Sequence, residues 1–250
     1  MKKYRTKPRF KIIVMCLLIL AMMGIKALIT PSVGEETAPV TGTTVEESKK
    51  PATETTNSKP VEKQSKYLIL VNKTHSIGKK DVPEDLQKLK TVASDRTSTY
   101  QQMSKPAAIA FEKLAAGAKA DGYEIVATTA YRPYNYQKEL YDNYVAKDGK
   151  TAAETYSAKP GTSEHQTGLS VDVSSPSVSY RLTQEYGKTA EGKWLAQNAH
   201  KYGFIIRFLK GRSEITGYEY EPWHIRYVGK QPAKEIYDQD ITLEEYLGKN

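Results

Sequence analysis

This chain of 250 residues contains a single cysteine. Beyond its first segment it also lacks a large excess of positive charge. The single Cys16 cannot form a disulfide within the chain or build a thiolate metal site. Six basic residues before residue 12 carry +6 of the formal net charge of +8, which leaves +2 for the remainder. That remainder holds no basic stripe suited to a phosphate backbone, so we expect no nucleic-acid partner.

Long apolar runs are also lacking, with one exception near the N-terminus. Residues 12–25 are apolar without interruption, Lys26 breaks the run, and residues 27–29 resume it. A basic segment before such a run is typical of a signal peptide or of an uncleaved membrane anchor. No Ala-x-Ala cleavage site follows, which favours an anchor over residues 1–30, with cleavage and secretion as the alternative. Either outcome predicts an extracytoplasmic location. Met15 stands where a lipidated cysteine would need a small residue, so lipidation of Cys16 is not expected.

Aromatic residues are missing from residues 31–65, where Thr, Glu, Ser, Pro and Lys dominate. Such a segment cannot bury enough apolar surface to offset the entropy lost on ordering it. We therefore predict a disordered tether over residues 31–65 and a folded domain over residues 66–250.

Short apolar stretches alternate with helical patterns from Lys66 onward. Strands are predicted at residues 67–72, 124–129, 170–173, 204–208 and 223–228. Helices are predicted from Ser104, as N-cap, to Asp121, and over residues 135–147, 151–157, 191–202, 232–237 and 243–247. Most of the chain between the first strand and Met103 is expected to be irregular or weakly helical. Helices outside a mostly antiparallel central sheet make this a compact α+β domain.

Two short clusters supply two imidazoles and two carboxylates. In the first, His165 and Asp172 are seven residues apart, and Gly168 between them allows a turn that brings a loop imidazole and a strand carboxylate together. The second cluster places Glu221 three residues before His224. A catalytic zinc takes three protein ligands and keeps a fourth position for water. Three ligands and a separate base predict one zinc ion per domain, in a cleft lined by the sheet.

Glu221 is the candidate base of this site. Pro222 holds the backbone extended before His224, and residues three apart on a strand point to opposite sides. Glu221 is therefore expected on the turn before the strand, near the metal without being a ligand. Zinc lowers the pKa of its water to about 7, and a carboxylate there can take the proton and return it to a leaving amine.

The remaining histidines and arginines have simpler readings. His75 lies in a turn with no acid near it in sequence, and His200 lies beside Lys201 in a predicted helix, so neither is expected to bind the metal. Arg132 is the best candidate for holding a free carboxylate through its guanidinium fork, although an ordinary surface arginine is the alternative. Arg207 and Arg226, on predicted strands, are weaker candidates for the same task.

The pattern Ser163-x-His165-x-x-Gly168-x-Ser170-x-Asp172, together with Glu221-Pro222-Trp223-His224, resembles the VanY-type D-alanyl-D-alanine carboxypeptidases. That group is related to lysostaphin-type peptidases and to the Hedgehog amino-terminal domain, and the resemblance runs from about Tyr67 to Leu247. It implies a zinc ion at His165, Asp172 and His224, with Glu221 as catalytic base. It also implies that the terminal D-alanine of the substrate contacts Arg132, Gln137 and Ser163. Ser170 departs from the pattern, because alanine is usual there.

The resemblance implies a monomeric bacterial enzyme that removes the C-terminal D-alanine from peptidoglycan stem peptides. Cleavage between the two D-alanines of a pentapeptide is the first expectation, and cleavage of an L,D bond in a tetrapeptide is the alternative. An endopeptidase that cuts cross-bridges is a third possibility. A zinc-containing wall-binding module without activity is an alternative of another class, against which the presence of Glu221 argues.

Overall fold

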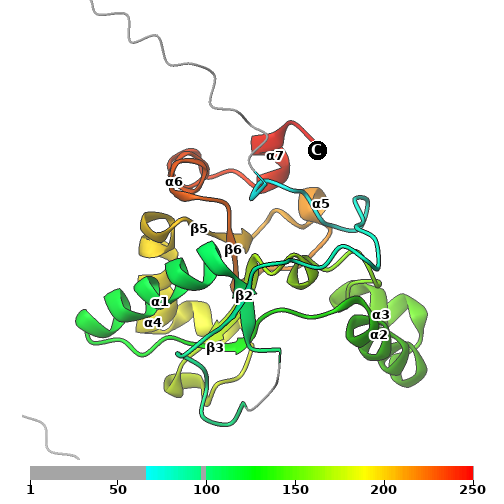
Figure 1. The fold of residues 1–250 in the computed structure, drawn as a ribbon, viewed down its shortest axis with the longest axis horizontal. Helices are drawn as coiled ribbons and strands as arrows, with labels where there is room; N and C mark the ends of the chain where they lie inside the picture. The colour runs from blue at the N-terminus through cyan, green and yellow to red at the C-terminus, as the bar shows by residue number, and fades with distance from the viewer. Residues whose placement is uncertain (1–65, 97–99, 250) are drawn as a thin grey trace, which may run out of the picture. The chain divides into compact units, whose positions relative to one another are not determined.

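The computed structural model describes residues 66–96 and 100–249. A four-stranded antiparallel sheet lies at the centre of this part of the chain, with the strand order β3-β4-β6-β5 (Figure 1). Its members are β3 (Val126–Thr129), β4 (Ser170–Ser174), β6 (Glu221–Tyr227) and β5 (Phe204–Phe208). Each of them overlaps a predicted strand. A small second sheet pairs β1 (Leu86–Lys88) with β2 (Gln102–Ser104).

Seven α-helices and four 3₁₀ helices surround the sheet in the part of the chain that the structure describes. The α-helices are α1 (Lys105–Ala120), α2 (Tyr134–Asp148), α3 (Lys150–Tyr156), α4 (Ala190–Asn198), α5 (Ser213–Thr216), α6 (Lys230–Gln239) and α7 (Leu243–Leu247). The 3₁₀ helices are η1 (Glu164–Thr167), η2 (Pro176–Val178), η3 (Gln184–Lys188) and η4 (Ala199–Tyr202). The helix predicted over residues 191–202 is thus α4 continued by η4, and it ends at Gly203 with a φ of 88°.

Side chains alternate between the two faces of the sheet, because successive residues of a strand point in opposite directions. Val171 and Val173 of β4 and Ile225 of β6 belong to an apolar core that they share with α1 and α4. The buried polar side chains of the same two strands lie on the other face; they are Ser170, Asp172, Ser174, His224 and Arg226. The predicted alternation in β4 therefore separates the hydrophobic core from a buried polar face.

A second, smaller core lies beside the first. It joins Leu68 and Leu70 to Ile205 and Val228 and to the apolar sides of α6 and α7. Burial of these side chains holds the C-terminal helix α7 against the domain, in line with the general gain from removing apolar surface from water. Figure 1 shows α6 and α7 on the same side of the sheet as α5.

One local prediction was wrong. Residues 67–72 do not form a strand; the carbonyls of Tyr67 and Ile69 instead accept hydrogen bonds from Arg226 at 3.0 and 2.6 Å. Most of the described chain between that segment and Met103 is irregular, as predicted, and the short strands β1 and β2 were not foreseen. The N-cap Ser104 starts α1 as predicted, but its hydroxyl donates to Asp85 and accepts no hydrogen bond from the first turn of the helix.

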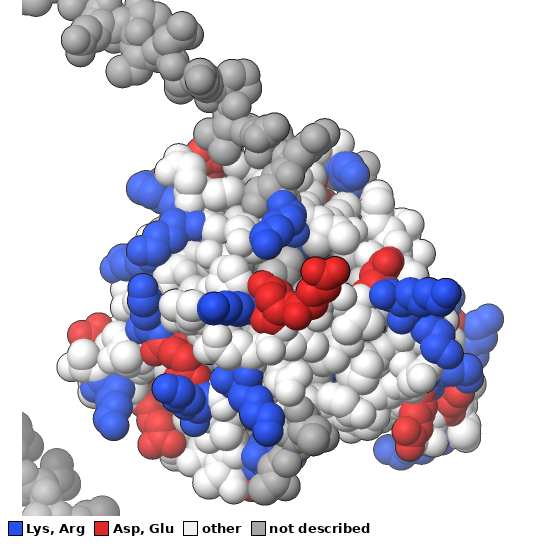
Figure 2. Space-filling model, viewed as in Figure 1, with Lys and Arg blue, Asp and Glu red and all other residues white. Residues whose placement is uncertain are grey.

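The predicted anchor and tether, residues 1–65, lie outside the described residues. Within residues 66–96 and 100–249, no helix is both long enough and apolar enough to cross a membrane. Lys and Arg side chains are interspersed with Asp and Glu on the face of the molecule that Figure 2 presents.

Candidate metal centre

Strand register brings two of the predicted ligands together. Asp172 of β4 is paired directly with His224 of β6, so their side chains leave the same face of the sheet next to each other. His165 reaches them from η1, which ends at Gly168 with a φ of 67° in the left-handed region. A Cβ on Gly168 would lie 3.1 Å from the backbone nitrogen of Ser104, so the turn requires glycine both for its conformation and for space.

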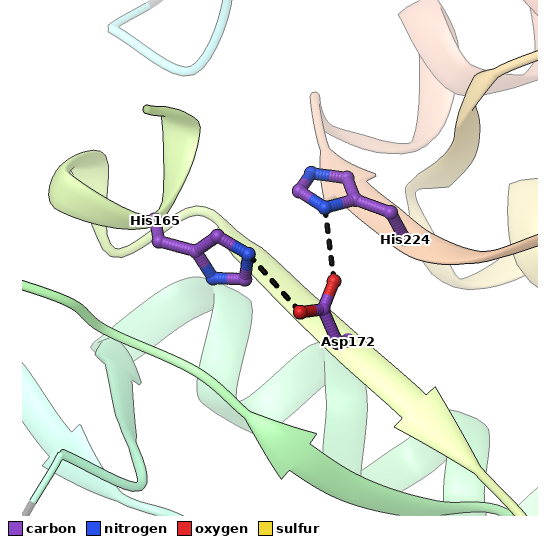
Figure 3. A group of neighbouring side chains, drawn as sticks. All are labelled: His165, Asp172 and His224. Atoms are coloured by element: carbon purple, nitrogen blue, oxygen red, sulfur yellow. Dashed lines mark hydrogen bonds and ion pairs between the residues drawn. The ribbon is translucent and has the colours of Figure 1, made fainter. Parts of the chain in front are cut away.

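The three side chains offer one ligand atom each, and these atoms all lie within 4.8 Å of one another (Figure 3). Nε2 of His165 is 3.3 Å from one oxygen of Asp172, and Nδ1 of His224 is 2.9 Å from the other. In a tetrahedral zinc site with bonds of about 2.0–2.2 Å, neighbouring ligand atoms lie about 3.4 Å apart. The cluster therefore fits a zinc ion with only small adjustments of the side chains.

Hydrogen bonds on the outer sides of the rings leave the correct nitrogens for a metal. Nδ1 of His165 is 2.8 Å from the carbonyl oxygen of Ala130, which can only accept, so Nδ1 carries the hydrogen and Nε2 has a lone pair. Both nitrogens of His224 face carboxylate oxygens, Nδ1 that of Asp172 at 2.9 Å and Nε2 that of Glu164 at 3.4 Å. A metal ion bound at Nδ1 would therefore leave the ring hydrogen on Nε2, directed at Glu164. Such outer partners are typical of histidines that bind metals.

Electrostatics favour an ionised Asp172. Burial opposes its charged form, but the charges and hydrogen bonds of His165 and His224 outweigh burial and hold the pKa of Asp172 far below its usual range. Burial also opposes the charged form of His224, yet hydrogen bonds to Asp172 and Glu164 raise the pKa of His224 to about 9. Burial lowers the pKa of His165. Without a metal ion, His224 is therefore the positively charged imidazolium at neutral pH, with a hydrogen on both ring nitrogens. A metal ion would take the place of the hydrogen on Nδ1 and supply the positive charge instead.

Glu221 lies beside this cluster without joining it. One of its oxygens is 3.8 Å from Nδ1 of His224. The expected turn position was wrong, because Glu221 is the first residue of β6. The register of β6 against β5 shifts between Ile206 and Phe208, where Glu221 pairs with Phe208, and this irregularity is compatible with Glu221 and His224 sharing a face. Burial raises the pKa of Glu221 to about 7.

The predicted substrate contacts lie in the same cleft, which has a volume of about 570 Å³. Arg132 donates to the side-chain oxygen of Gln137 at 2.6 Å, and Gln137 donates to the carbonyl of Ala158 at 2.7 Å. Nε of Arg132 is buried and has no hydrogen-bond partner among the described residues. Ser163 also lines the cleft. Arg132 is therefore not the ordinary surface arginine of the alternative reading.

Two arginines were assigned wrongly from the sequence. Arg207 and Arg226 do not face a substrate; both are fully buried, and both donate to Glu164, at 2.7 and 2.6 Å. Glu164 itself was overlooked because it directly precedes His165. The available signal was an arginine inside each of two otherwise apolar strands, since a buried charge needs a buried partner.

The two histidines expected to be outside the site are outside it. His75 interacts with Asn72 and Thr74, and His200 stacks on Tyr237 with ring centroids 3.8 Å apart. Neither belongs to the cluster of possible metal ligands.

Comparison with known proteins agrees with this geometry. Residues 100–230 match the family model of VanY, D-alanyl-D-alanine carboxypeptidase. A putative carboxypeptidase of Bacillus subtilis, YodJ, is 44% identical over 195 residues, which cover 76% of this chain and 70% of the relative. A D-alanyl-D-alanine carboxypeptidase of Enterococcus faecalis is 35% identical over 215 residues, which cover 82% and 75%.

Solved structures give the same result. The LdcB LD-carboxypeptidase superimposes with a TM-score of 0.69 at 46% identity, over 72% of this chain and 85% of that chain. A mutant of the vancomycin-resistance D,D-pentapeptidase VanY in complex with Zn(II) superimposes with a TM-score of 0.61 at 35% identity, over 73% and 99%. The predicted α+β fold and the predicted enzyme class are confirmed. The chain belongs to the VanY family of D-alanyl-D-alanine carboxypeptidases.

Proposed function

We propose that this chain is a zinc carboxypeptidase that releases the C-terminal D-alanine from peptidoglycan stem peptides. The observation that carries the proposal is the convergence of two imidazole nitrogens and one carboxylate in a cleft, with the carboxylate of Glu221 beside them and not among them. Among the relatives, one VanY structure holds Zn(II) and another VanY structure holds D-alanine-D-alanine.

His165, Asp172 and His224 would hold the zinc ion. When bound, zinc lowers the pKa of a water molecule to about 7 and polarises a substrate carbonyl. The carboxylate of Glu221 then receives the proton of the attacking water and passes it to the nitrogen of the departing D-alanine. Its partial burial suits this role, because a carboxylate whose pKa is raised toward neutrality takes up a proton more readily than an exposed carboxylate does.

Arg132 would bind the free carboxylate at the end of the substrate. Its side chain lines the cleft, and its buried Nε has a hydrogen to donate. Gln137 holds the other side of the guanidinium, and the backbone N–H of Arg132 donates to the carbonyl of His165, which ties this anchor to a metal ligand. A carboxylate anchor close to the metal favours removal of a terminal residue over cleavage of an internal bond.

The bond before the terminal D-alanine is the open choice. The D,D reaction is the first candidate, because the family model and the relative from Enterococcus faecalis are named for it. The L,D reaction is favoured by a different observation, the 46% identity to the LdcB LD-carboxypeptidase against 35% to the D,D-pentapeptidase.

Mass spectrometry of muropeptides incubated with the zinc-loaded protein tests both candidates. Loss of one alanine from a pentapeptide alone assigns the D,D reaction, and loss of one alanine from a tetrapeptide alone assigns the L,D reaction. Glu221→Gln serves as the inactive control. Zinc binding without release of alanine from either peptide would instead support a wall-binding module, and cutting of cross-bridges would support an endopeptidase.

The proposed reaction takes place outside the cytoplasm, since its substrate belongs to the cell wall. The basic residues and apolar run of residues 1–30 support this location from sequence. Fractionation of cells and sequencing of the mature N-terminus would test it. A protein found in the cytoplasmic fraction would contradict it, and a mature terminus after Ile29 would exclude the anchor.

A further inference from the structure

Four hydrogen-bond donors converge on the buried carboxylate of Glu164. Its Oε1 accepts from Nε of Arg207 at 2.7 Å and from a terminal nitrogen of Arg226 at 2.6 Å. Its Oε2 accepts from the hydroxyl of Ser170 at 3.0 Å and faces Nε2 of His224 at 3.4 Å. Both oxygens are therefore fully used, one by two cations and the other by a hydroxyl and an imidazole.

Glu164 lies on the far side of the His224 ring from the proposed metal position. Asp172 and Glu221 approach Nδ1 of His224, whereas Glu164 approaches Nε2. Glu164 is not among the residues that could share an ion. Its contact with the site is therefore through the imidazole, and an ionised carboxylate there can only accept the hydrogen of Nε2.

The position of that hydrogen decides whether His224 can bind a metal. A neutral imidazole has one hydrogen, so a hydrogen on Nε2 leaves the lone pair on Nδ1, and a hydrogen on Nδ1 blocks it. Resting on the zinc site proposed above, we propose that Glu164 is a positioning residue that keeps the hydrogen of His224 on Nε2 and thereby directs the Nδ1 lone pair to the zinc ion.

A neutral side chain of the same shape cannot replace Glu164. Glutamine offers one accepting oxygen and one NH₂ group, whereas the two arginines can only donate and occupy one of the two oxygen positions. An NH₂ group turned toward Arg207 and Arg226 would meet two cations, and a buried cation without its partner is costly. An NH₂ group turned toward His224 would require Nε2 to accept, which places the ring hydrogen on Nδ1.

A second buried glutamate, Glu244, binds Arg207 as Glu164 does but has no contact with His224, and it offers a matched control. Arg207 also donates to both oxygens of Glu244 in α7, at 2.8 and 2.6 Å, and Asn72 donates to the same carboxylate at 3.0 Å. Glu164 and Glu244 are both buried, and both bind Arg207. Glu244 has no hydrogen bond to His224, so Glu244→Gln removes a comparable buried charge without changing the partner of the imidazole.

Zinc affinity, measured on the purified full chain by competition with a chromogenic chelator, tests the assignment. We expect zinc affinity about 10–100-fold weaker in Glu164→Gln, the usual effect of losing an outer partner of a metal-binding histidine. In Glu244→Gln we expect a lower Tm and a zinc affinity close to that of the wild type. In ¹⁵N-edited NMR of the zinc-loaded protein, the Nε2–H of His224 should give a slowly exchanging signal in the wild type and in Glu244→Gln, and should be shifted or lost in Glu164→Gln.

Two results would overturn the assignment: equal loss of zinc affinity in both variants, or wild-type affinity with an unchanged His224 signal in Glu164→Gln. If Glu164→Gln does not fold, Glu164→Asp takes its place, because it keeps the negative charge for the arginines and withdraws the oxygen from His224. Wild-type zinc affinity in a folded Glu164→Asp would also overturn it. Failure of the wild type to bind zinc would refute the proposed function instead, so the two failures are distinguishable.

Discussion

Zinc binding to this site should release protons, because the metal-free His224 is protonated on both ring nitrogens at neutral pH. Hydrogen bonds to Asp172 and Glu164 overcome burial and raise its pKa to about 9, and the nitrogen that faces Asp172 must be free of hydrogen before it can bind a cation. Below this pKa the imidazole is protonated, so the apparent zinc affinity should rise tenfold for each pH unit up to about pH 9, which is about 1.4 kcal/mol per unit.

Two neighbouring groups set the limits of this slope. The pKa of Asp172 is far below its usual range, so it contributes no proton near neutral pH. Burial raises the pKa of Glu221 to about 7, and a nearby cation would favour its ionised form, so Glu221 should release a second proton below pH 7. His224 alone gives a plot of the logarithm of zinc affinity against pH a slope of one up to about pH 9. Glu221 adds to this slope below pH 7, and the water that zinc would bind, with a pKa of about 7, adds to it above pH 7.

Calorimetric titration of the metal-free protein with zinc, in buffers with different enthalpies of ionisation, counts the released protons directly. Glu221→Gln is the control, because it should release one proton fewer than the wild type below pH 7 and leave the slope above pH 7 unchanged. A zinc affinity that is independent of pH between 7 and 9 would show that His224 is neutral in the metal-free protein, and would refute the reasoning from its two carboxylate partners.

Three further predictions concern single residues. Glu221→Gln should retain zinc and lose at least about 10²-fold in turnover, whereas His224→Ala should lose the metal. Zinc content and the rate of D-alanine release distinguish the two variants, and near-normal turnover in Glu221→Gln would exclude Glu221 as the base. Arg132→Ala should leave zinc affinity unchanged and lower kcat/KM about 10–100-fold by raising KM, because it removes a hydrogen bond between charged groups. An effect on zinc content alone would argue against a carboxylate anchor. Gly168→Ala should lower the free energy of unfolding in urea by about 1–2 kcal/mol, because its φ of 67° is unfavourable for a side chain, and an unchanged unfolding midpoint would contradict this account.

The strands of the central sheet could be predicted because their sequence period is strong, but their pairing could not. Alternation in Ser170–Ser174 assigns the valines to one face and Asp172 to the other from sequence alone. That Asp172 lies opposite His224, however, depends on β6 lying next to β4, a long-range pairing that no local pattern specifies. The metal cluster was therefore expected from its residue types, and its geometry came only with the register.

The differences between prediction and structure have separate physical causes. Residues 67–72 have the composition of a strand, but the Arg226 side chain bonds to carbonyls that a neighbouring strand would otherwise engage. The strands β1 and β2 have three residues each, too few for a period to be visible. Glu164 was overlooked because it directly precedes a predicted metal ligand, although the arginines within the two predicted strands indicate a buried acidic partner.

The position of the ligands within the sheet bears on how much the site must move to accept a metal. Asp172 and His224 lie on β4 and β6, the two central strands, so each of these strands has a hydrogen-bonded neighbour on both sides. His165 comes from the short helix η1, but its ring is held by the carbonyl of Ala130 and its own carbonyl by the N–H of Arg132. Sites built on such supported elements lose little conformational entropy on binding. We therefore expect the backbone around the three ligands to have the same conformation with and without zinc. The main change on metal binding should be the loss of the proton on Nδ1 of His224.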